Sequence, residues 1–377
     1  MRSRVTALAR KETRELLRDP IYLTLALLVP LVIMGLLGLG LSMDVKNLPL
    51  LFYDQDHSAL SREYINSFTN SEYFHLLGLA RDDAEAARYL QAGEARGVVV
   101  IPPDFSHRLH GGEPVAIQVL IDGSFPSRAD VVRGYIAAIN AQFNERVLQE
   151  YLSARGQAVS LVFPVTVEGR VWYNPTLESK NSIVPGLLVL NLLFSSALFA
   201  SLVVAREKES GTIFNLYCSP VRRVEVIAGK ALPYIGVTFI NYLMIFIMSL
   251  TVFKARFTGS FALLTAGSLL YIACTIGIGL LVSILVRTQI AAMLITFMIT
   301  IIPAFLYSGF LTPVSSLEAT GQLISYVIPA TWFIGMVRGI YLKGLGFSYY
   351  AWNLATLTVY AAAVYALAVL FFKKREG

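Results

Sequence analysis

Few side chains in this chain have the types and spacing that catalysis or metal binding requires. Asp104, His107 and His110 follow one another at intervals of three residues, so a helix would bring them together as ligands for a metal ion. The same spacing is commoner on a solvated helix face, and we expect no metal there. Gly229 and Lys230 lack the earlier glycine and the following Ser or Thr of a phosphate-binding loop. We therefore expect no catalytic residue in this chain, which is not predicted to be an enzyme.

The composition is that of a membrane protein. Hydrophobic residues make up 55% of the 377 residues and charged residues only 15%, whereas soluble domains carry about 25% charged residues. Six uncharged runs are each long enough to span a bilayer, which takes about 20 helical residues. They are 20–43, 181–205, 231–253, 257–286, 288–317 and 344–372. The first run exceeds the apolar part of a signal peptide, about 7–15 residues, so we expect a retained helix.

The basic residues indicate on which side of the membrane each end lies. Residues 1–19 are rich in arginine, and the chain finishes in a basic tail at 373–377. Because basic flanks remain in the cytoplasm, we expect both ends there, with six spans between them. A seventh apolar run then belongs to an outer re-entrant hairpin at about 313–337. The net charge of +6 follows from this topology and requires no nucleic acid as a partner.

Residues 1–19 fit an amphipathic helix at the inner membrane surface, a cytoplasmic interface helix. Val5, Leu8, Ala9, Leu16 and Leu17 can share one face, while the arginines meet lipid headgroups. The alternative is a basic anchor with no further role.

Residues 44–180, between the first two spans, are expected to form an extracytoplasmic α/β domain. Neither Cys218 nor Cys274 lies in it, so we expect no disulfide. Asp82 is suited to cap a helix, with Glu85 three residues further on. The predicted strands are 48–53, 97–101, 115–121 and 165–172, and the predicted helices are 58–68, 82–91 and 127–155. The predicted fold class is thus a membrane α-helical bundle of six transmembrane helices with an inserted α/β extracytoplasmic domain.

The spans contain no Asp, Glu, Lys, Arg or His. Ion-coupled carriers usually keep such groups in the membrane as relays or ion sites, so this class of protein is disfavoured. If the chain does work on a solute, its energy comes from a partner.

A charged segment, 206–230, joins the second span to the third. Its basic surplus places it in the cytoplasm. Because it continues into two spanning helices, a motor outside the membrane could push on both of them through it.

The charged segment also carries a resemblance. It contains Arg206-Glu207-Lys208-Glu209, Gly211-Thr212, Ser219-Pro220-Val221-Arg222-Arg223 and Gly229-Lys230. The stretches LPLLFYDQDHSALSREY and GVVVIPPDFS, and the region 308–344, add to the pattern, which covers essentially the whole chain. In these features the chain resembles the permease subunits of type-2 ABC exporters. It departs from them at Glu318-Ala319, where an apolar residue and a proline are usual.

The resemblance implies cytoplasmic ATP-binding subunits, which would hold ATP and Mg, and a second permease chain in a homodimer or heterodimer. It implies that 206–217 contributes a coupling helix to the ATPase contact, that the N-terminal helix adds to this contact, and that 316–326 is part of the outer hairpin. The alternative is that 206–230 is an ordinary basic loop. The implied coupling residues are Arg206, Glu207, Lys208, Glu209, Gly211, Thr212, Phe214, Leu216, Arg222, Arg223, Gly229 and Lys230.

Small and polar residues inside the spans are further candidates for a pathway or a dimer interface. Gly35 and Gly38 would allow close approach of a partner helix, or simply a bend. Asn191, Ser195 and Asn241 would supply a polar seam, with hydrogen bonds between helices as the alternative.

Two functions from different classes fit these features. One is the permease subunit of an ATP-driven exporter in the bacterial inner membrane, moving an amphipathic or hydrophobic substrate such as a drug or a lipid-like molecule. The outer domain would then dock a periplasmic adaptor that continues to an outer-membrane channel. The other is a mechanotransmitter or envelope scaffold that moves its outer domain without passing a substrate. The polar seam favours transport.

Overall fold

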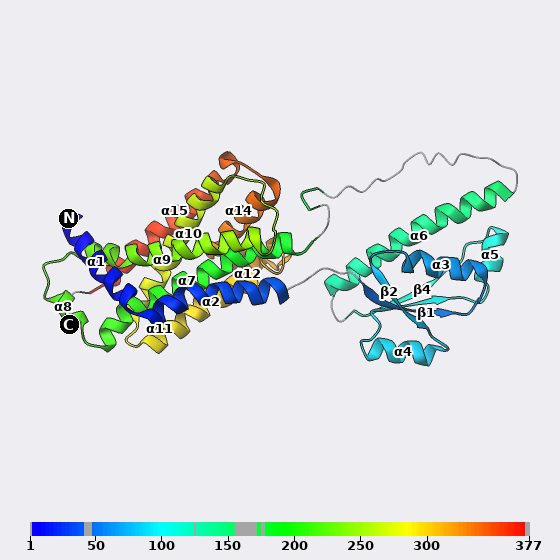
Figure 1. The fold of residues 1–377 in the computed structure, drawn as a ribbon, viewed down its shortest axis with the longest axis horizontal. Coiled ribbons are helices and arrows are strands. Elements are labelled where there is room, and N and C mark those ends of the chain that lie inside the picture. Colours follow the sequence, from blue (N-terminus) through cyan, green and yellow to red (C-terminus); the bar gives the residue numbers. More distant parts are fainter. Residues whose placement is uncertain (1, 41–46, 124–125, 155–171, 175–177, 374–377) are drawn as a thin grey trace. The chain divides into compact units, whose positions relative to one another are not determined.

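The computed structural model describes residues 2–40, 47–123, 126–154, 172–174 and 178–373. The chain divides into two compact units (Figure 1). One comprises Met1–Ser42 with Arg170–Gly377, and the other comprises Met43–Gly169.

The larger unit is a helical bundle (Figure 1). Six of its described helical segments are long and apolar enough to cross a membrane, in agreement with the six predicted runs. The helices of this unit are α1 (Arg2–Arg18), α2 (Pro20–Gly40), α7 (Lys180–Glu209), α8 (Ile213–Tyr217), α9 (Arg223–Thr251), α10 (Phe261–Leu285), α11 (Gln289–Thr296), α12 (Ile302–Tyr307), α13 (Ala319–Val327), α14 (Pro329–Lys343) and α15 (Phe347–Phe371).

Helix α7 lies in the middle of the bundle and contacts α2, α9, α10, α11 and α14. Its closest approach is to α10, because a Cβ atom at Gly279 would collide with the carbonyl oxygen of Ala197. Ser283 on α10 accepts hydrogen bonds from the backbone N–H groups of Val204 and Ala205, at 2.9 and 2.8 Å. Small and hydroxylated residues thus allow the two backbones to meet.

The fifth apolar segment differs from the single regular helix that was expected. A π-helical turn, Phe297–Ile301, separates α11 from α12. Pro303 follows it and has no N–H to donate to the preceding turn, which is a common reason for such a break.

The run predicted as a re-entrant hairpin is also broken. Helices α13 and α14 meet at an angle of 87°. Pro329 begins α14, so Ile328 is held in an extended conformation and the helix cannot continue through it. Arg338 on α14 donates hydrogen bonds to the carbonyl oxygens of Ser182, Gly309 and Phe310, at 3.3, 2.6 and 2.8 Å. It therefore ties this broken pair to the start of α7.

The smaller unit contains a four-stranded sheet of order β2-β1-β3-β4, in which β1 is parallel to β2 and β3, and β4 is antiparallel to β3. Helices α3, α5 and α6 cover one face, and α4 covers the other. The elements are β1 (Leu48–Asp54), α3 (Ala59–Thr69), β2 (Phe74–Leu79), α4 (Asp83–Gln91), β3 (Gly97–Ile101), α5 (Phe105–Gly111), β4 (Gln118–Ile121) and α6 (Pro126–Ala154).

The predicted strands and helices of this unit mostly recur, with two omissions. Strand β2 and helix α5 were not predicted as elements, and β4 is shorter than expected. Strand β2 was not predicted because Leu77 and Leu79 are apolar although they are exposed. The sequence therefore lacks the alternation of apolar and polar residues that indicates a half-buried strand. Asp82 caps α4 by accepting from the Glu85 N–H at 2.6 Å. The strand predicted at 165–172 lies almost entirely outside the described residues.

The contact between α7 and α10 can be tested by adding one methyl group. Gly279→Ala should lower the thermal unfolding temperature of the purified protein, because overpacking a tight contact costs about 1–3 kcal/mol. Gly236→Ala is the matched control, since nothing lies within 4 Å of a Cβ atom there. Equal unfolding temperatures for the two variants would contradict the close approach.

Candidate coupling site at the end of α7

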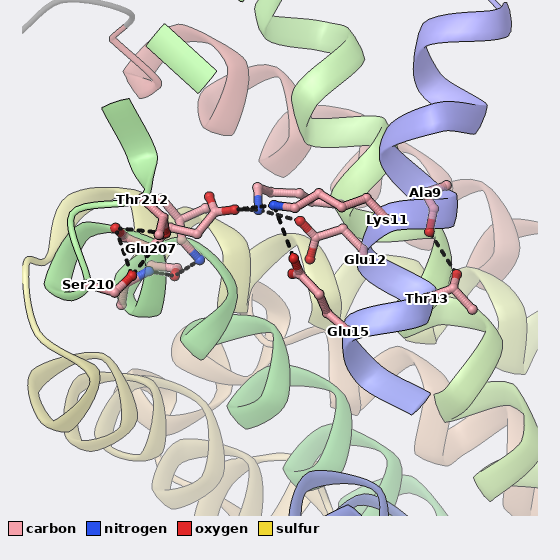
Figure 2. A network of polar contacts seen from close by, with 12 residues as sticks. Ala9, Lys11, Glu12, Thr13, Glu15, Glu207, Ser210 and Thr212 are labelled. Atoms are coloured by element: carbon pink, nitrogen blue, oxygen red, sulfur yellow. Dashed lines mark hydrogen bonds and ion pairs between the residues drawn. The ribbon is translucent and has the colours of Figure 1, made fainter. Parts of the chain in front are cut away.

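The residues predicted to couple the chain to a motor gather where α7 ends, close to α1, α8 and the start of α9 (Figure 2). Arg206–Glu209 is not a loop but the last turn of α7. Successive side chains on that turn point in different directions, so each one can reach a different neighbouring element.

The first two charged residues of this turn hold the N-terminal region. Arg206 pairs with Asp19, at the junction of α1 and α2, through Nη1 and Oδ2 at 3.2 Å. Glu207 Oε1 lies 2.9 Å from Lys230 Nζ on α9 and 3.3 Å from Lys11 Nζ on α1.

The next two charged residues hold the turn between α10 and α11. Lys208 Nζ donates to the carbonyl oxygens of Val286, at 2.9 Å, and of Ile284, at the C-terminus of α10. Glu209 Oε2 accepts from the Gln289 backbone N–H at 2.9 Å, at the N-terminus of α11. Both charges complement the partial charge at the helix end that they meet. The four residues thus fasten the end of α7 to four other places in the bundle.

Lys230 is fully buried, with 0% of its side chain exposed, and lies between two carboxylates. Its Nζ is 2.7 Å from Glu12 Oε1 on α1 and 2.9 Å from Glu207 Oε1. A buried charge is tolerated only when it is paired, so this triad joins α1, α7 and α9. Glu207 Oε2 is buried and makes no hydrogen bond within the described chain.

Lys11 adds a second cation at the edge of the triad (Figure 2). It bridges Glu207 and Glu15, at 3.3 and 3.4 Å. Burial acts to lower the pKa of Lys11, but the carboxylates of Glu207, Glu12 and Glu15 outweigh it and raise the pKa above its ordinary value. Lys11 therefore remains charged throughout the neutral range.

Helix α1 packs on α9 through the face that was predicted to be apolar. A Cβ atom at Gly229 would lie 2.7 Å from the Leu8 Cβ, so only glycine allows this contact. Leu16 is buried, but Leu17 is 63% exposed and belongs to the opposite side of the helix. The prediction that Leu17 shares the face of Leu8 and Leu16 is therefore wrong, because 100° per residue separates neighbours on a helix.

Helix α8 presents one buried and one exposed side. Ile213 and Leu216 are buried, whereas Phe214 is 59% exposed. Gly211 has a φ of +73°, a conformation that glycine adopts readily, and it turns the chain sharply between α7 and α8. Thr212, Arg222 and Arg223 are exposed, and the Arg222 N–H donates to Glu225 Oε2 at 2.8 Å to cap α9.

The predicted coupling residues therefore separate into two sets. Arg206–Glu209, Gly211, Leu216, Gly229 and Lys230 serve contacts within the bundle, whereas Thr212, Phe214, Arg222 and Arg223 face outward. Sequence reasoning missed Glu12, which completes the triad. Its signal was an acidic residue four positions from both Leu8 and Leu16 on an otherwise apolar face.

The candidate pathway residues do not form one cluster. Gly38 on α2 lies against the ring of Phe253, which follows α9. Asn241 Nδ2 on α9 donates to the Ala26 carbonyl oxygen on α2 at 3.3 Å. A Cβ atom at Gly35 would lie 3.6 Å from the Met248 side chain, also on α9. Ser195 on α7 donates to the carbonyl oxygen of Asn191 at 2.9 Å.

Asn191 differs from Ser195 and Asn241, the other two polar candidates, each of which donates a hydrogen bond. It is only 2% exposed, and neither its amide nitrogen nor its amide oxygen has a partner among the described residues. A buried amide without partners is costly, which makes Asn191 the most informative of this set.

Asp104, His107 and His110, which were weighed as metal ligands, belong to the smaller unit. Asp104 pairs with Arg108 at 3.4 Å, and His110 Nδ1 lies 2.6 Å from the Ser106 carbonyl oxygen. Over the described residues, no three His, Cys, Asp or Glu side chains are grouped as metal ligands.

A family model described as "ABC-2 family transporter protein" matches residues 20–370. This chain belongs to the ABC-2 transporter family. Membership identifies a membrane permease and implies a partnership with ATP-binding subunits.

Relatives in Escherichia coli (strain K12) agree with the family assignment. The chain is 30% identical to "Probable multidrug ABC transporter permease YbhS", over 90% of this chain and 89% of that one. It is 27% identical to "Probable multidrug ABC transporter permease YbhR" over 99% of each chain. It is also 27% identical to "Inner membrane transport permease YhhJ", over 97% of this chain and 96% of that one.

The triad predicts a large effect from removing its central charge. Lys230→Met should destabilise the purified permease by about 3–5 kcal/mol, because it leaves Glu12 and Glu207 buried beside an apolar side chain. Lys11→Met is the control, since that lysine is half exposed and should cost less than about 1 kcal/mol. Thermal unfolding followed by tryptophan fluorescence would measure both variants.

Adding Glu12→Leu and Glu207→Leu to Lys230→Met should recover much of the lost stability, because no buried charge then lacks a partner. If the losses of stability caused by the three substitutions instead add up, the three charges do not stabilise one another.

Proposed function

We propose that this chain is the membrane subunit of an ATP-driven exporter in the bacterial inner membrane, with both termini in the cytoplasm. Its substrate is an amphipathic or hydrophobic molecule, such as a drug or a lipid-like compound, that leaves the cytoplasm or the inner leaflet. The observation that carries this proposal is the family match across 20–370. The names of the two "probable multidrug" relatives support the class of substrate.

The ATP-binding subunits, which hold ATP and Mg, dock on the outward-facing set at α8 and the start of α9. Aromatic residues and arginine are enriched in protein interfaces, and both are exposed here, as Phe214 on α8 and as Arg222 and Arg223 where α9 begins. Phe214 would fill a pocket in the partner, and Arg222 and Arg223 would meet acidic groups around it.

The last turn of α7 then distributes the movement of α8. A displacement of this turn is passed to α1 and α9 through the triad, and to the α10–α11 turn through Lys208 and Glu209. Since charge-assisted hydrogen bonds hold every one of these connections, the helices move together rather than one by one.

The α/β unit lies between the first two of the six candidate spans. With the N-terminus in the cytoplasm, as proposed, it would be on the outer side of the membrane. There it would dock a periplasmic adaptor that leads to an outer-membrane channel. A second permease chain completes the pathway, as a homodimer or a heterodimer. No feature of the structure favours a mechanotransmitter or scaffold over a transporter.

The docking surface can be separated from the internal contacts. Phe214→Ala combined with Arg222→Glu and Arg223→Glu should weaken copurification of the ATP-binding partner by about tenfold or more, since each tenfold step is about 1.4 kcal/mol. Phe347→Ala is the control for the loss of an exposed phenylalanine. Phe347 is 66% exposed and begins α15, whereas Phe372, just after the opposite end of α15, contacts Tyr217 of α8. Unchanged copurification of the triple variant would refute docking at α8.

Asn191 offers a test of the pathway. Asn191→Leu should raise the stability of the permease by about 1–3 kcal/mol, because it removes an unpaired buried amide, and should slow export of a fluorescent amphiphile by the reconstituted transporter. A variant that is both less stable and fully active would show that Asn191 has only a structural role.

A further inference from the structure

Three arginines form a stripe on α1 that the coupling site leaves unused. Arg10, Arg14 and Arg18 lie on successive turns, are exposed, and have no hydrogen-bond or ion-pair partner within the described part of the chain. Together with Thr6, Ala7, Lys11 and Glu15 they line one open side of the helix.

The stripe faces away from the bundle. Leu8, Glu12 and Leu16 mark the side of α1 that packs on α9, and Arg10 and Arg14 lie on the opposite side at 100° per residue. Five nearby basic residues have partners within the bundle: Arg4 donates to the Pro220 carbonyl oxygen, and Lys11, Arg206, Lys208 and Lys230 are bound as described above. The charge of the stripe is therefore available to a ligand.

The position of the stripe favours a lipid as that ligand. Arg18 ends α1, four residues before Tyr22, where the first candidate span begins. Leu17 lies on the same side and is 63% exposed, so an apolar side chain accompanies the arginines at the end nearest the hydrocarbon. Arginines with an exposed apolar neighbour beside a span are typical of an interfacial membrane contact.

We propose that Arg10, Arg14 and Arg18 bind the phosphate headgroup of an acidic phospholipid, with Leu17 against the upper part of its acyl chain. Arginine presents paired N–H donors that match phosphate oxygens. A lipid with net negative charge is required because a zwitterionic headgroup brings its own cation to a site that already has three. The proposal rests on the proposed function only in placing α1 at the cytoplasmic leaflet.

Lipid binding also has a consequence for coupling. Glu12 on the opposite side of α1 belongs to the triad with Lys230 and Glu207. A headgroup held by the stripe therefore steadies the helix that the triad joins to α7 and α9, and ATP hydrolysis by the complete transporter should depend on acidic lipid.

The test uses the complete transporter, the permease with its ATP-binding partner, in nanodiscs of phosphatidylcholine with increasing phosphatidylglycerol. Native mass spectrometry counts the phosphatidylglycerol retained, and ATP hydrolysis is measured in parallel. Arg10→Gln, Arg14→Gln and Arg18→Gln together should weaken phosphatidylglycerol binding by about 100-fold, at roughly fivefold for each basic residue near an anionic surface. The corresponding triple Arg→Lys variant should recover part of the binding, because it keeps the charge but loses the paired donors.

The control variant carries Arg62→Gln, Arg81→Gln and Arg256→Gln, which remove the same charge from exposed arginines elsewhere. It should retain phosphatidylglycerol as the wild type does. Equal retention by the stripe variant and the wild type would overturn the proposal, and so would equal losses in the stripe and control variants.

A third outcome distinguishes a protein ligand from a lipid. If the stripe variant loses the ATP-binding partner even in phosphatidylcholine alone, the stripe is a protein interface and the lipid proposal fails. The variant at Phe214, Arg222 and Arg223 tests docking at α8 by copurification. Phosphatidylglycerol binding is measured independently, so it can be interpreted even if docking at α8 is refuted.

Discussion

The buried ammonium group of Lys230 is the interaction on which the cytoplasmic half of the proposed mechanism depends. Two carboxylates, from α1 and α7, meet it at 2.7 and 2.9 Å. Separating these groups would leave buried charges without partners, which is costly. In the proposed mechanism the triad would therefore make α1 move together with α7 and α9, the two helices that the chain connects to α8.

The six spans of the bundle could be predicted from the sequence, because a helix that crosses the hydrocarbon needs an uncharged run of about 20 residues. All six candidate spans follow from this rule. The π turn at Phe297–Ile301 could not be read in this way, since both an unbroken helix and a broken one satisfy the same rule. In the α/β unit, β1 and β3 were evident from their β-branched and aromatic residues, but β2 was hidden by the exposed Leu77 and Leu79.

At the coupling site the sequence indicated where the charges lie but not what they bind. Arg206 and Lys208 were expected to contact a soluble partner. In the structure Arg206 pairs with Asp19, and Lys208 donates hydrogen bonds to the carbonyl oxygens at the end of α10. Partners such as Glu12 and Lys230, 218 positions apart, cannot be recognised from local spacing. By contrast, Phe214 keeps its outward position because Ile213 and Leu216 occupy the inward side of so short a helix.

The separation between Glu12 and Lys230 has a consequence for biogenesis. At a translation rate of about 5–20 residues per second, Glu12 leaves the ribosome roughly 10 to 40 s before Lys230 is synthesised. During this interval the carboxylate must stay hydrated, and α1 has no completed surface on which to settle. The triad can close only after Lys230, near the start of α9, has been synthesised, so it forms later than the first two candidate spans are made.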